Sequence, residues 1–204
     1  MLKDKVKVAV FVSGGGTNLQ AILESERRGE IPDAEISLVL SNNPSAYALE
    51  RAKNFGVKSV CVDKSVYKTL EERERKTIDI LEENGVELIV LAGYLSILSS
   101  DFTKKYEDRI INVHPSLIPS FCGRGYYGLK VHEEALKYGV KVTGATVHFV
   151  NEIPDGGKII MQKAVSVEDG DTPEILQKRV MREAEWLLLP ASLEKVAKKL
   201  RENK

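Results

Sequence analysis

Short apolar segments alternate with longer amphipathic segments through the first two thirds of the chain. The apolar segments contain few polar positions, which is typical of parallel strands covered by helices on both faces. They predict strands at residues 6–12, 36–41, 58–62, 87–91 and 109–113. The amphipathic segments predict helices at residues 18–28, 46–55, 66–84 and 128–138, the last three of which end just before a glycine.

The pattern changes in the last third. Residues 143–150 and 158–165 predict two strands, and the sequence "NEIPDGG" between them predicts a long loop. From Thr172 onward the spacing predicts a long amphipathic helix, which we expect Pro190 to kink or break. The whole chain therefore predicts an α/β fold: a doubly wound, Rossmann-like, mostly parallel sheet with a C-terminal antiparallel pair and a long C-terminal helix.

Composition narrows the class of protein. The 204 residues are 43% apolar and 29% charged, and no linker rich in Pro, Gly or Ser divides them, so we expect a single domain over residues 1–204. Thirty basic and thirty acidic residues give a net charge of zero, which argues against a large nucleic-acid interface. No signal peptide, membrane span or disulfide framework is evident, so a cytoplasmic enzyme is expected.

A glycine-rich loop, "SGGGTNLQAIL" at residues 13–23, follows the first predicted strand. Ligands of doubly wound sheets bind beyond the carboxyl ends of the strands, and a glycine loop before a helix suits a phosphate. A G-x-G-x-x-G motif begins at Gly14, but Leu19 occupies its third glycine position, so a phosphorylated small molecule fits better than a dinucleotide. The alternative is a tight turn with Thr17 or Asn18 capping the helix.

A second candidate site lies in "INVHPSLIP", where Asn112 and His114 are two residues apart on a predicted strand. Side chains at this spacing point to the same side. An amide donates hydrogen bonds to a developing oxyanion, and an imidazole transfers protons near neutral pH. Pro115 and Pro119 restrict the loop that follows. The alternative is a histidine that only caps the strand end, but the paired amide favours chemistry.

Asp155, in the predicted loop "NEIPDGG", is the carboxylate expected to pair with His114, although an ordinary Asp-Gly turn is the alternative. His132 is expected to be solvated on a surface helix. His148 is interpreted as structural or as a support for another site residue, rather than catalytic. The chain has no His-x-x-x-His motif and no paired cysteines, so no metal site is expected.

Five stretches together resemble the phosphoribosylglycinamide formyltransferases of purine biosynthesis. They occur in the family's order and are "SGGGTNLQAI" (13–22), "VLAGYLSILS" (90–99), "INVHPSLIP" (111–119), "GATVHFV" with "DGG" (144–157) and "EWLLLP" (185–190). The resemblance implies transfer of a formyl group from the co-substrate 10-formyltetrahydrofolate to the amine of glycinamide ribonucleotide. It implies small-molecule substrates, no metal, no nucleic acid, no membrane, and a monomer or homodimer. It also implies a phosphate-binding half at residues 1–100 and a folate-binding, catalytic half at residues 101–204.

The resemblance also assigns site residues by position. The implied catalytic residues are Asn112, His114 and Asp155. The implied ribonucleotide-binding residues are Gly16, Thr17, Asn18, Pro115 and Glu185. The implied folate-binding residues are Leu95, Ser96, Ile97, Leu98, Asn112, Val150, Asn151, Pro154 and Asp155.

Two departures from the family pattern are visible. Many members carry Arg at the position of Ser96, and the stretch "SFCGRGYYGLKV" at residues 120–131 is longer than in the commonest form of the family. Two alternatives stay open beside the transferase: a formyltetrahydrofolate hydrolase, and a catalytically silent folate- or phosphate-binding protein of the same fold. Methionyl-tRNA formyltransferases are less similar in the glycine loop.

Overall fold

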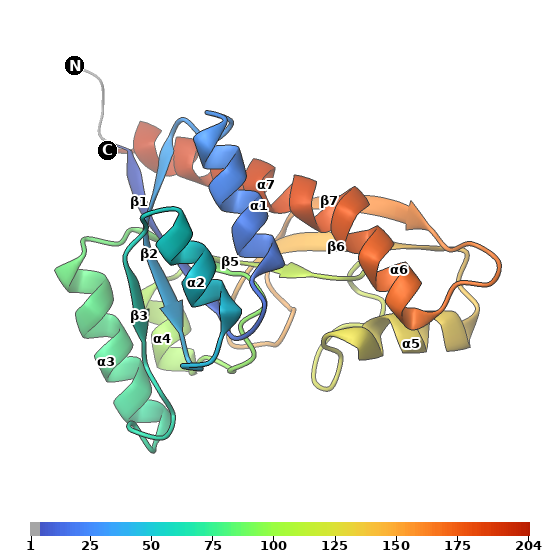
Figure 1. Ribbon diagram of the computed structural model, residues 1–204, viewed down its shortest axis with the longest axis horizontal. Coiled ribbons are helices and arrows are strands. Elements are labelled where there is room, and N and C mark those ends of the chain that lie inside the picture. The colour runs from blue at the N-terminus through green and yellow to red at the C-terminus, as the bar shows by residue number, and fades with distance from the viewer. Residues whose placement is uncertain (1–4) are drawn as a thin grey trace.

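Seven strands form one mixed sheet in the computed structural model, which describes residues 5–204 (Figure 1). They are β1 (Val6–Val12), β2 (Ala34–Ser41), β3 (Ser59–Cys61), β4 (Leu88–Leu91), β5 (Ile110–His114), β6 (Val142–Phe149) and β7 (Ile159–Ser166). Their order across the sheet is β3-β2-β1-β4-β5-β6-β7. Neighbours from β3 to β5 run parallel, whereas β5–β6 and β6–β7 are antiparallel. The predicted fold class is confirmed.

Helices cover both faces of this sheet. They are α1 (Thr17–Arg27), α2 (Tyr47–Asn54), α3 (Leu70–Glu83), α4 (Ser100–Lys105), α5 (Leu129–Tyr138), α6 (Pro173–Val180) and α7 (Trp186–Glu202). One apolar core joins the sheet to α1, α2, α6 and α7, and a second joins it to α3 and α4. In β1, Val8 and Val10 belong to the first core and Ala9 and Phe11 to the second, so a strand buried on both faces explains the continuous apolar pattern.

Two helix starts differ from the predicted pattern because side-chain caps decide them. α3 begins at Leu70, four residues after the predicted start, because Thr69 and Glu72 form a reciprocal capping box. The short helix α4 was absent from the prediction. It begins after Ser99, whose hydroxyl accepts a hydrogen bond from the amide of Phe102 at 3.1 Å.

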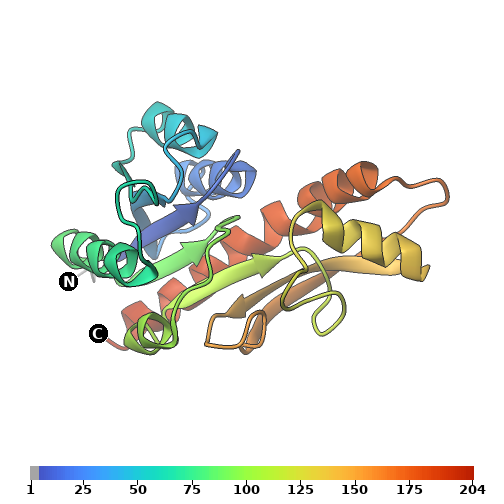
Figure 2. The ribbon, with the colours of Figure 1, turned by 90° about the horizontal axis from the view of Figure 1, so that it is seen from below.

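The predicted break of the C-terminal helix at Pro190 is wrong. Pro190 lies inside α7, and the irregular part comes earlier, in a π-helical turn (Met181–Glu185) that joins α6 to α7. Figure 2 shows α7 crossing one face of the sheet, with α5 beside α6. Within residues 5–204, no helix has both the length and the apolar character needed to cross a membrane.

The topology brings three loops together at one edge of the sheet. β4 lies between β1 and β5, and all three strands are parallel, so the loops that follow them meet at the carboxyl edge. The hydroxyl of Ser13, after β1, accepts a hydrogen bond from the amide of Leu95, after β4, at 2.9 Å. Asn42, after β2, donates to the hydroxyl of Ser96 at 2.7 Å. The candidate ligand-binding residues therefore lie on loops that hydrogen bonds connect at one edge of the sheet.

Candidate active site

The glycine loop turns sharply into α1. Gly16 has a φ of 73°, and a Cβ added to it would lie 2.6 Å from the Cβ of Ala48, so only glycine fits this position. Gly14 and Gly15 are exposed, with open space around them. The alternative, a side-chain cap from Thr17 or Asn18, is wrong, because Gly16 is the N-cap and no side chain within residues 5–204 caps the helix through a hydrogen bond. Backbone amides at this helix start are thus open to an anion.

Asn18 and Glu185 form a buried pair directly behind this loop. The Nδ2 of Asn18 donates to the Oε2 of Glu185 at 2.7 Å, and Glu185 is 6% exposed. The π-helical turn ends at Glu185, and the pair links it to the first turn of α1. Burial raises the pKa of Glu185, and the hydrogen bond from Asn18 offsets part of that rise. The Oδ1 of Asn18 is buried and has no hydrogen-bond partner among residues 5–204.

Asn112 and His114 lie at the carboxyl end of β5, where β6 pairs with them. Asn112 lies opposite His148, and His114 lies opposite Thr146. The Nε2 of His114 is 2.9 Å from the carbonyl oxygen of Phe121. A carbonyl oxygen only accepts hydrogen bonds, so Nε2 carries a proton in this arrangement. The other ring nitrogen, Nδ1, is therefore the one that faces Asp155.

Asp155 holds a position between two imidazoles. Its Oδ2 lies 3.5 Å from the Nδ1 of His114, and its Oδ1 lies 3.6 Å from the Nε2 of His148. The amide of Gly123 donates to Oδ2 at 2.8 Å. Asp155 has a φ of 56°, a left-handed conformation that Asp tolerates better than most residues. A Cβ on Gly157 would lie 1.7 Å from the carbonyl oxygen of Phe149, which explains a glycine there.

The two predicted catalytic partners shift each other's pKa. For Asp155, burial raises the pKa, but the adjacent His148 ring, the charge of His114 and the Gly123 amide together bring it below the usual value. For His114, burial lowers the pKa, while Asp155 and the Phe121 carbonyl counteract part of that effect. At neutral pH the aspartate is therefore ionised and the free-state imidazole is largely neutral.

His148 touches two of the predicted catalytic residues. It is 1% exposed, and its Nδ1 donates to the carbonyl of Phe149 at 2.8 Å, which leaves Nε2 as an acceptor in the neutral ring. The Nδ2 of Asn112 lies 3.2 Å from that nitrogen. His148 therefore fixes the orientation of the Asn112 amide and lies against Asp155. The sequence predicted the strand that contains His148 and a supporting role for its side chain. The contacts themselves come from pairing between β5 and β6, which a local sequence pattern does not reveal.

The expectation that His132 is solvated is wrong. Its side chain is 0% exposed, and neither ring nitrogen has a hydrogen-bond partner within the part of the chain that the structure describes. It lies with Val131 and Ala135 on the buried face of α5. Burial, and then the nearby charge of His114, lower the pKa of His132 to about 4.

A cleft of about 130 Å³ opens beside Asn112 and Asp155. Its lining contains nearly all the predicted folate residues, together with others that the motifs did not indicate. The lining is Leu91, Tyr94, Ser96, Ile97, Leu98, Asn112, His148, Val150, Asn151, Glu152, Ile153, Pro154 and Asp155. Leu95 is not among them and is 68% exposed. Apolar and polar side chains therefore both line this cleft, as in many small-molecule sites.

A metal site needs several ligand side chains close together. Among residues 5–204, no three His, Cys, Asp or Glu side chains gather as a metal site requires.

Comparisons with known proteins give the family. A model described as formyl transferase matches residues 6–192. The chain is 40% identical to the phosphoribosylglycinamide formyltransferase of Haemophilus influenzae, over 90% of this chain and 84% of that protein. The structure of glycinamide ribonucleotide transformylase 1 from Symbiobacterium toebii is similar with a TM-score of 0.89 and 38% identity, over 96% of this chain and 89% of that one.

A longer relative is also similar. The chain is 46% identical to the trifunctional purine biosynthetic protein adenosine-3 of Gallus gallus, over 95% of this chain but only 19% of that protein. The chain thus spans about a fifth of the length of the trifunctional relatives that it matches. The match over residues 6–192 and the similarity to relatives of comparable length show that the chain belongs to the formyl transferase family. The family resemblance of the sequence motifs is confirmed.

Proposed function

We propose that this protein transfers the formyl group of 10-formyltetrahydrofolate to the amine of glycinamide ribonucleotide, a reaction of purine biosynthesis. One observation carries the proposal: Asn112 and Asp155 line the cleft, and the Nδ1 of His114 lies 3.5 Å from the Oδ2 of Asp155. Family membership and the activity for which relatives at about 40% identity are named support it. Both ligands are small molecules, and no reacting group has to come from a metal.

The folate ring would bind in the cleft beside Asn112. Ile97, Leu98 and Val150 provide apolar walls, and the loop from Asn151 to Asp155 provides polar groups at one side. When bound, the folate supplies the formyl group. In this binding mode the formyl group would lie near Asn112, and the apolar side chains of the cleft would exclude water that competes with the amine.

The ribonucleotide would bind with its phosphate at the glycine loop. The amides at the start of α1 and the helix dipole favour a negative charge beside Gly16 and Thr17. The buried Asn18–Glu185 pair lies next to that loop, where a ribose would follow the phosphate. Binding energy from the phosphate then positions the amine for attack. In this scheme residues 1–100 supply the phosphate loop, and residues 101–204 supply the catalytic side chains.

Asn112 and His114 are the proposed donors to the oxyanion. One N–H of the Asn112 amide faces His148, which leaves the second available to the cleft. The Nε2–H of His114 donates to the carbonyl of Phe121 in this structure. For His114 to donate to substrate, that carbonyl must release Nε2, so movement of the loop at residues 120–131 is part of the proposed cycle. Hydrogen-bond donors at this position stabilise the negative charge that develops on the oxygen of the formyl group.

Asp155 is proposed to support the proton transfers. Attack by the amine puts a positive charge on its nitrogen, and one proton must then reach the folate nitrogen that leaves. Because the pKa of Asp155 is held below its usual value, it is a carboxylate at neutral pH and accepts a proton or stabilises a charged His114. A water molecule between the two nitrogens completes the path without another side chain.

The test is a formyl-transfer assay with a choice of acceptor. The purified protein is mixed with 10-formyltetrahydrofolate and with glycinamide ribonucleotide, tRNA or buffer alone, and loss of the formyl group is followed. Loss that depends on the ribonucleotide supports the proposal. Equal loss in buffer alone identifies a hydrolase, and no loss with retained folate binding identifies a silent binding protein.

A further inference from the structure

Three successive carbonyl oxygens of the glycine loop accept hydrogen bonds from one short segment, residues 43–51. This segment contains the end of the loop after β2 and the start of α2, which lies beside α1 (Figure 1). The loop is therefore held from one side. The carbonyl of Ser13 accepts from the Nδ2 of Asn43 at 3.1 Å, that of Gly14 from the amide of Ala48 at 3.1 Å, and that of Gly15 from the Nε of Arg51 at 2.8 Å.

The amides that follow these carbonyls point the other way. In a trans peptide the C=O and N–H groups lie on opposite sides of the bond, and none of the peptide bonds of this loop is cis. The amides of residues 14, 15 and 16 therefore face away from residues 43–51. No hydrogen bond among residues 5–204 has one of these amides as its donor, and open space surrounds Gly14 and Gly15. Three N–H groups thus lie on the side of the loop where an anion would bind.

Arg51 is the charged residue among the three donors. Its Nη1 also donates to the Oε1 of Gln20 in α1 at 3.0 Å, and its Cζ lies 5.1 Å from the centre of the Tyr47 ring. These contacts fix the plane of the guanidinium against the loop. Within the part of the chain that the structure describes, no carboxylate forms an ion pair with Arg51. Its positive charge is therefore directed at the Gly15 carbonyl.

A cation at a carbonyl oxygen also affects the amide at the other end of the same peptide. The charge draws electron density toward the oxygen of Gly15 and makes the N–H of Gly16 a stronger donor. A Cβ on Gly16 would lie 3.4 Å from the Cδ of Arg51, so this side chain packs directly against that peptide. Because Gly16 is the N-cap of α1, the polarised amide adjoins the open amides of the first helical turn.

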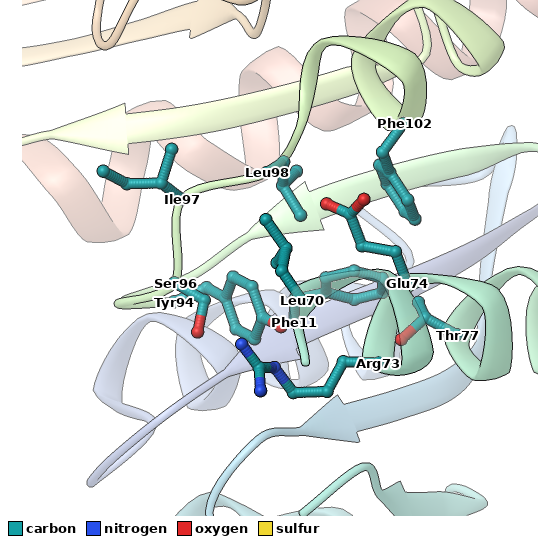
Figure 3. Close-up of a pocket in the computed structure, with 10 residues that line it drawn as sticks. All are labelled: Phe11, Leu70, Arg73, Glu74, Thr77, Tyr94, Ser96, Ile97, Leu98 and Phe102. Atoms are coloured by element: carbon teal, nitrogen blue, oxygen red, sulfur yellow. The ribbon is translucent and has the colours of Figure 1, made fainter. Parts of the chain in front are cut away.

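A second arginine near the cleft contacts a different surface. Figure 3 shows Arg73 of α3 with its guanidinium toward Tyr94 and Ser96, where it lines a hollow of about 10 Å³. It donates to two carbonyls just before α3. Among the hydrogen bonds of residues 5–204, the bond from Arg51 is the one in which a Lys or Arg side chain binds the glycine loop. Arg51 is therefore the cation that acts on this loop.

We propose that Arg51 is a positioning residue for the phosphate of the ribonucleotide. Its guanidinium holds and polarises the peptide between Gly15 and Gly16, so that the loop amides are oriented before the ligand arrives. The inference rests on the proposed function, because it assumes that a phosphate occupies the glycine loop. Arg51 acts through the peptide, from the side opposite to the amides, and contact with the phosphate is not required.

Steady-state kinetics and NMR of the ligand-free protein test the inference. Arg51→Met keeps most of the aliphatic stem and removes both the donors and the charge. We expect its KM for glycinamide ribonucleotide to rise about tenfold, while kcat and the KM for 10-formyltetrahydrofolate change less than about twofold. The amide resonances of Gly15 and Gly16 are expected to shift in Arg51→Met without any ligand. The Kd for ribose 5-phosphate, followed by NMR titration, is expected to rise with the KM for the ribonucleotide.

Matched variants separate this role from a general effect of charge. Lys53→Met removes a positive charge from an exposed position of the same helix, and all of these quantities are expected to stay at their wild-type values. Arg51→Lys keeps the charge, but one ammonium group does not span both Gly15 and Gln20 as the guanidinium does. We expect it to fold even if Arg51→Met does not, and to show an intermediate KM for the ribonucleotide.

The possible outcomes are distinguishable. A wild-type KM for the ribonucleotide in Arg51→Met, or in Arg51→Lys, overturns the inference and leaves the proposed function standing. An equal rise of both KM values also overturns it, because Arg51 then stabilises the fold as a whole. A raised KM with unshifted Gly15 and Gly16 resonances overturns it as well, because the charge then acts on the phosphate directly. Absence of ribonucleotide-dependent formyl transfer by the wild-type protein overturns the proposed function and this inference together.

Discussion

The carboxylate of Asp155 lies 3.5 Å from the Nδ1 of His114, across the gap between a strand end and a loop that follows another strand. Burial lowers the pKa of His114, and the charge of Asp155 is the largest effect that opposes it. The charge of Asp155 therefore offsets part of the fall that burial causes, and the pKa of His114 stays below its ordinary value. This balance is the basis of the first prediction.

Asp155→Asn is expected to lower the pKa of His114 further, because a neutral amide no longer stabilises the charged ring. Asn also tolerates the left-handed φ of 56° at this position, so the loop is expected to keep its shape. We expect turnover at neutral pH to fall by about 10²-fold or more. Ring-proton NMR titration measures the pKa, and a formyl-transfer assay measures the rate. Asp169→Asn, at a fully exposed carboxylate, is the control. An unchanged pKa of His114 would show that the two groups do not interact in solution.

His148→Gln is expected to raise the pKa of Asp155, because the nearby His148 ring, whose Nε2 lies 3.6 Å from Oδ1, is the largest of the effects that lower it. A carboxylate with a higher pKa becomes protonated at higher pH. The acid limb of the pH–rate profile is therefore expected to move to higher pH, and turnover at neutral pH to fall by about tenfold as Asn112 loses its partner. An acid limb at the wild-type position would contradict the contact between His148 and Asp155.

The fold could be predicted because local sequence patterns determine most of its strands and helices. Strands buried on both faces, such as β1, leave a continuous apolar signal, and several helices end at glycine. The predicted strands agree with the observed ones to within two residues at every end. The start of α3 and the existence of α4 were missed because single side chains, Thr69 and Ser99, decide them.

The candidate site was predictable only where chemistry-bearing residues share one strand end. Asn112 and His114 are two residues apart, so their common direction follows from the strand period. The contacts of Asp155 depend on a loop closing against β5, and those of His148 on antiparallel register. His132 was assigned to solvent because its neighbours are charged, whereas its side chain packs inward from α5. The spacing of residues along the chain predicts neither which distant segments pair nor which face of a helix turns toward the core.

Gly16→Ala is expected to destabilise the protein more than Gly29→Ala. Both glycines have positive φ, 73° and 76°, so both substitutions carry the backbone strain of about 1 kcal/mol. Only at Gly16 does the new methyl group meet another atom, the Cβ of Ala48 at 2.6 Å. We expect a total loss of about 2–4 kcal/mol there. Urea unfolding measures both free energies, and the KM for the ribonucleotide is expected to rise in Gly16→Ala alone. Equal losses of unfolding free energy in the two variants would mean that the loop accommodates the methyl group at residue 16 without a free-energy cost.

His132→Met is expected to make the protein less sensitive to acid. The pKa of His132 is lowered from 6.5 to about 4 in the folded protein. As the pH falls, the unfolded chain therefore binds a proton at His132 before the folded protein does. The stability that depends on the neutral ring is present above about pH 6.5 and is lost progressively toward about pH 4. Methionine is a similarly sized, adaptable side chain that does not titrate.

The comparison of wild type with His132→Met isolates this one group, since the other titrating residues are common to both. At pH 8 both side chains are neutral, and the difference in unfolding free energy there reports packing alone. Between pH 7 and pH 5 that difference is expected to shift by about 1–2 kcal/mol in favour of the variant. Urea unfolding at each pH measures it. A difference that stays constant with pH would mean that the ring is protonated or hydrated in the folded protein, and that α5 opens enough in solution to let water reach it.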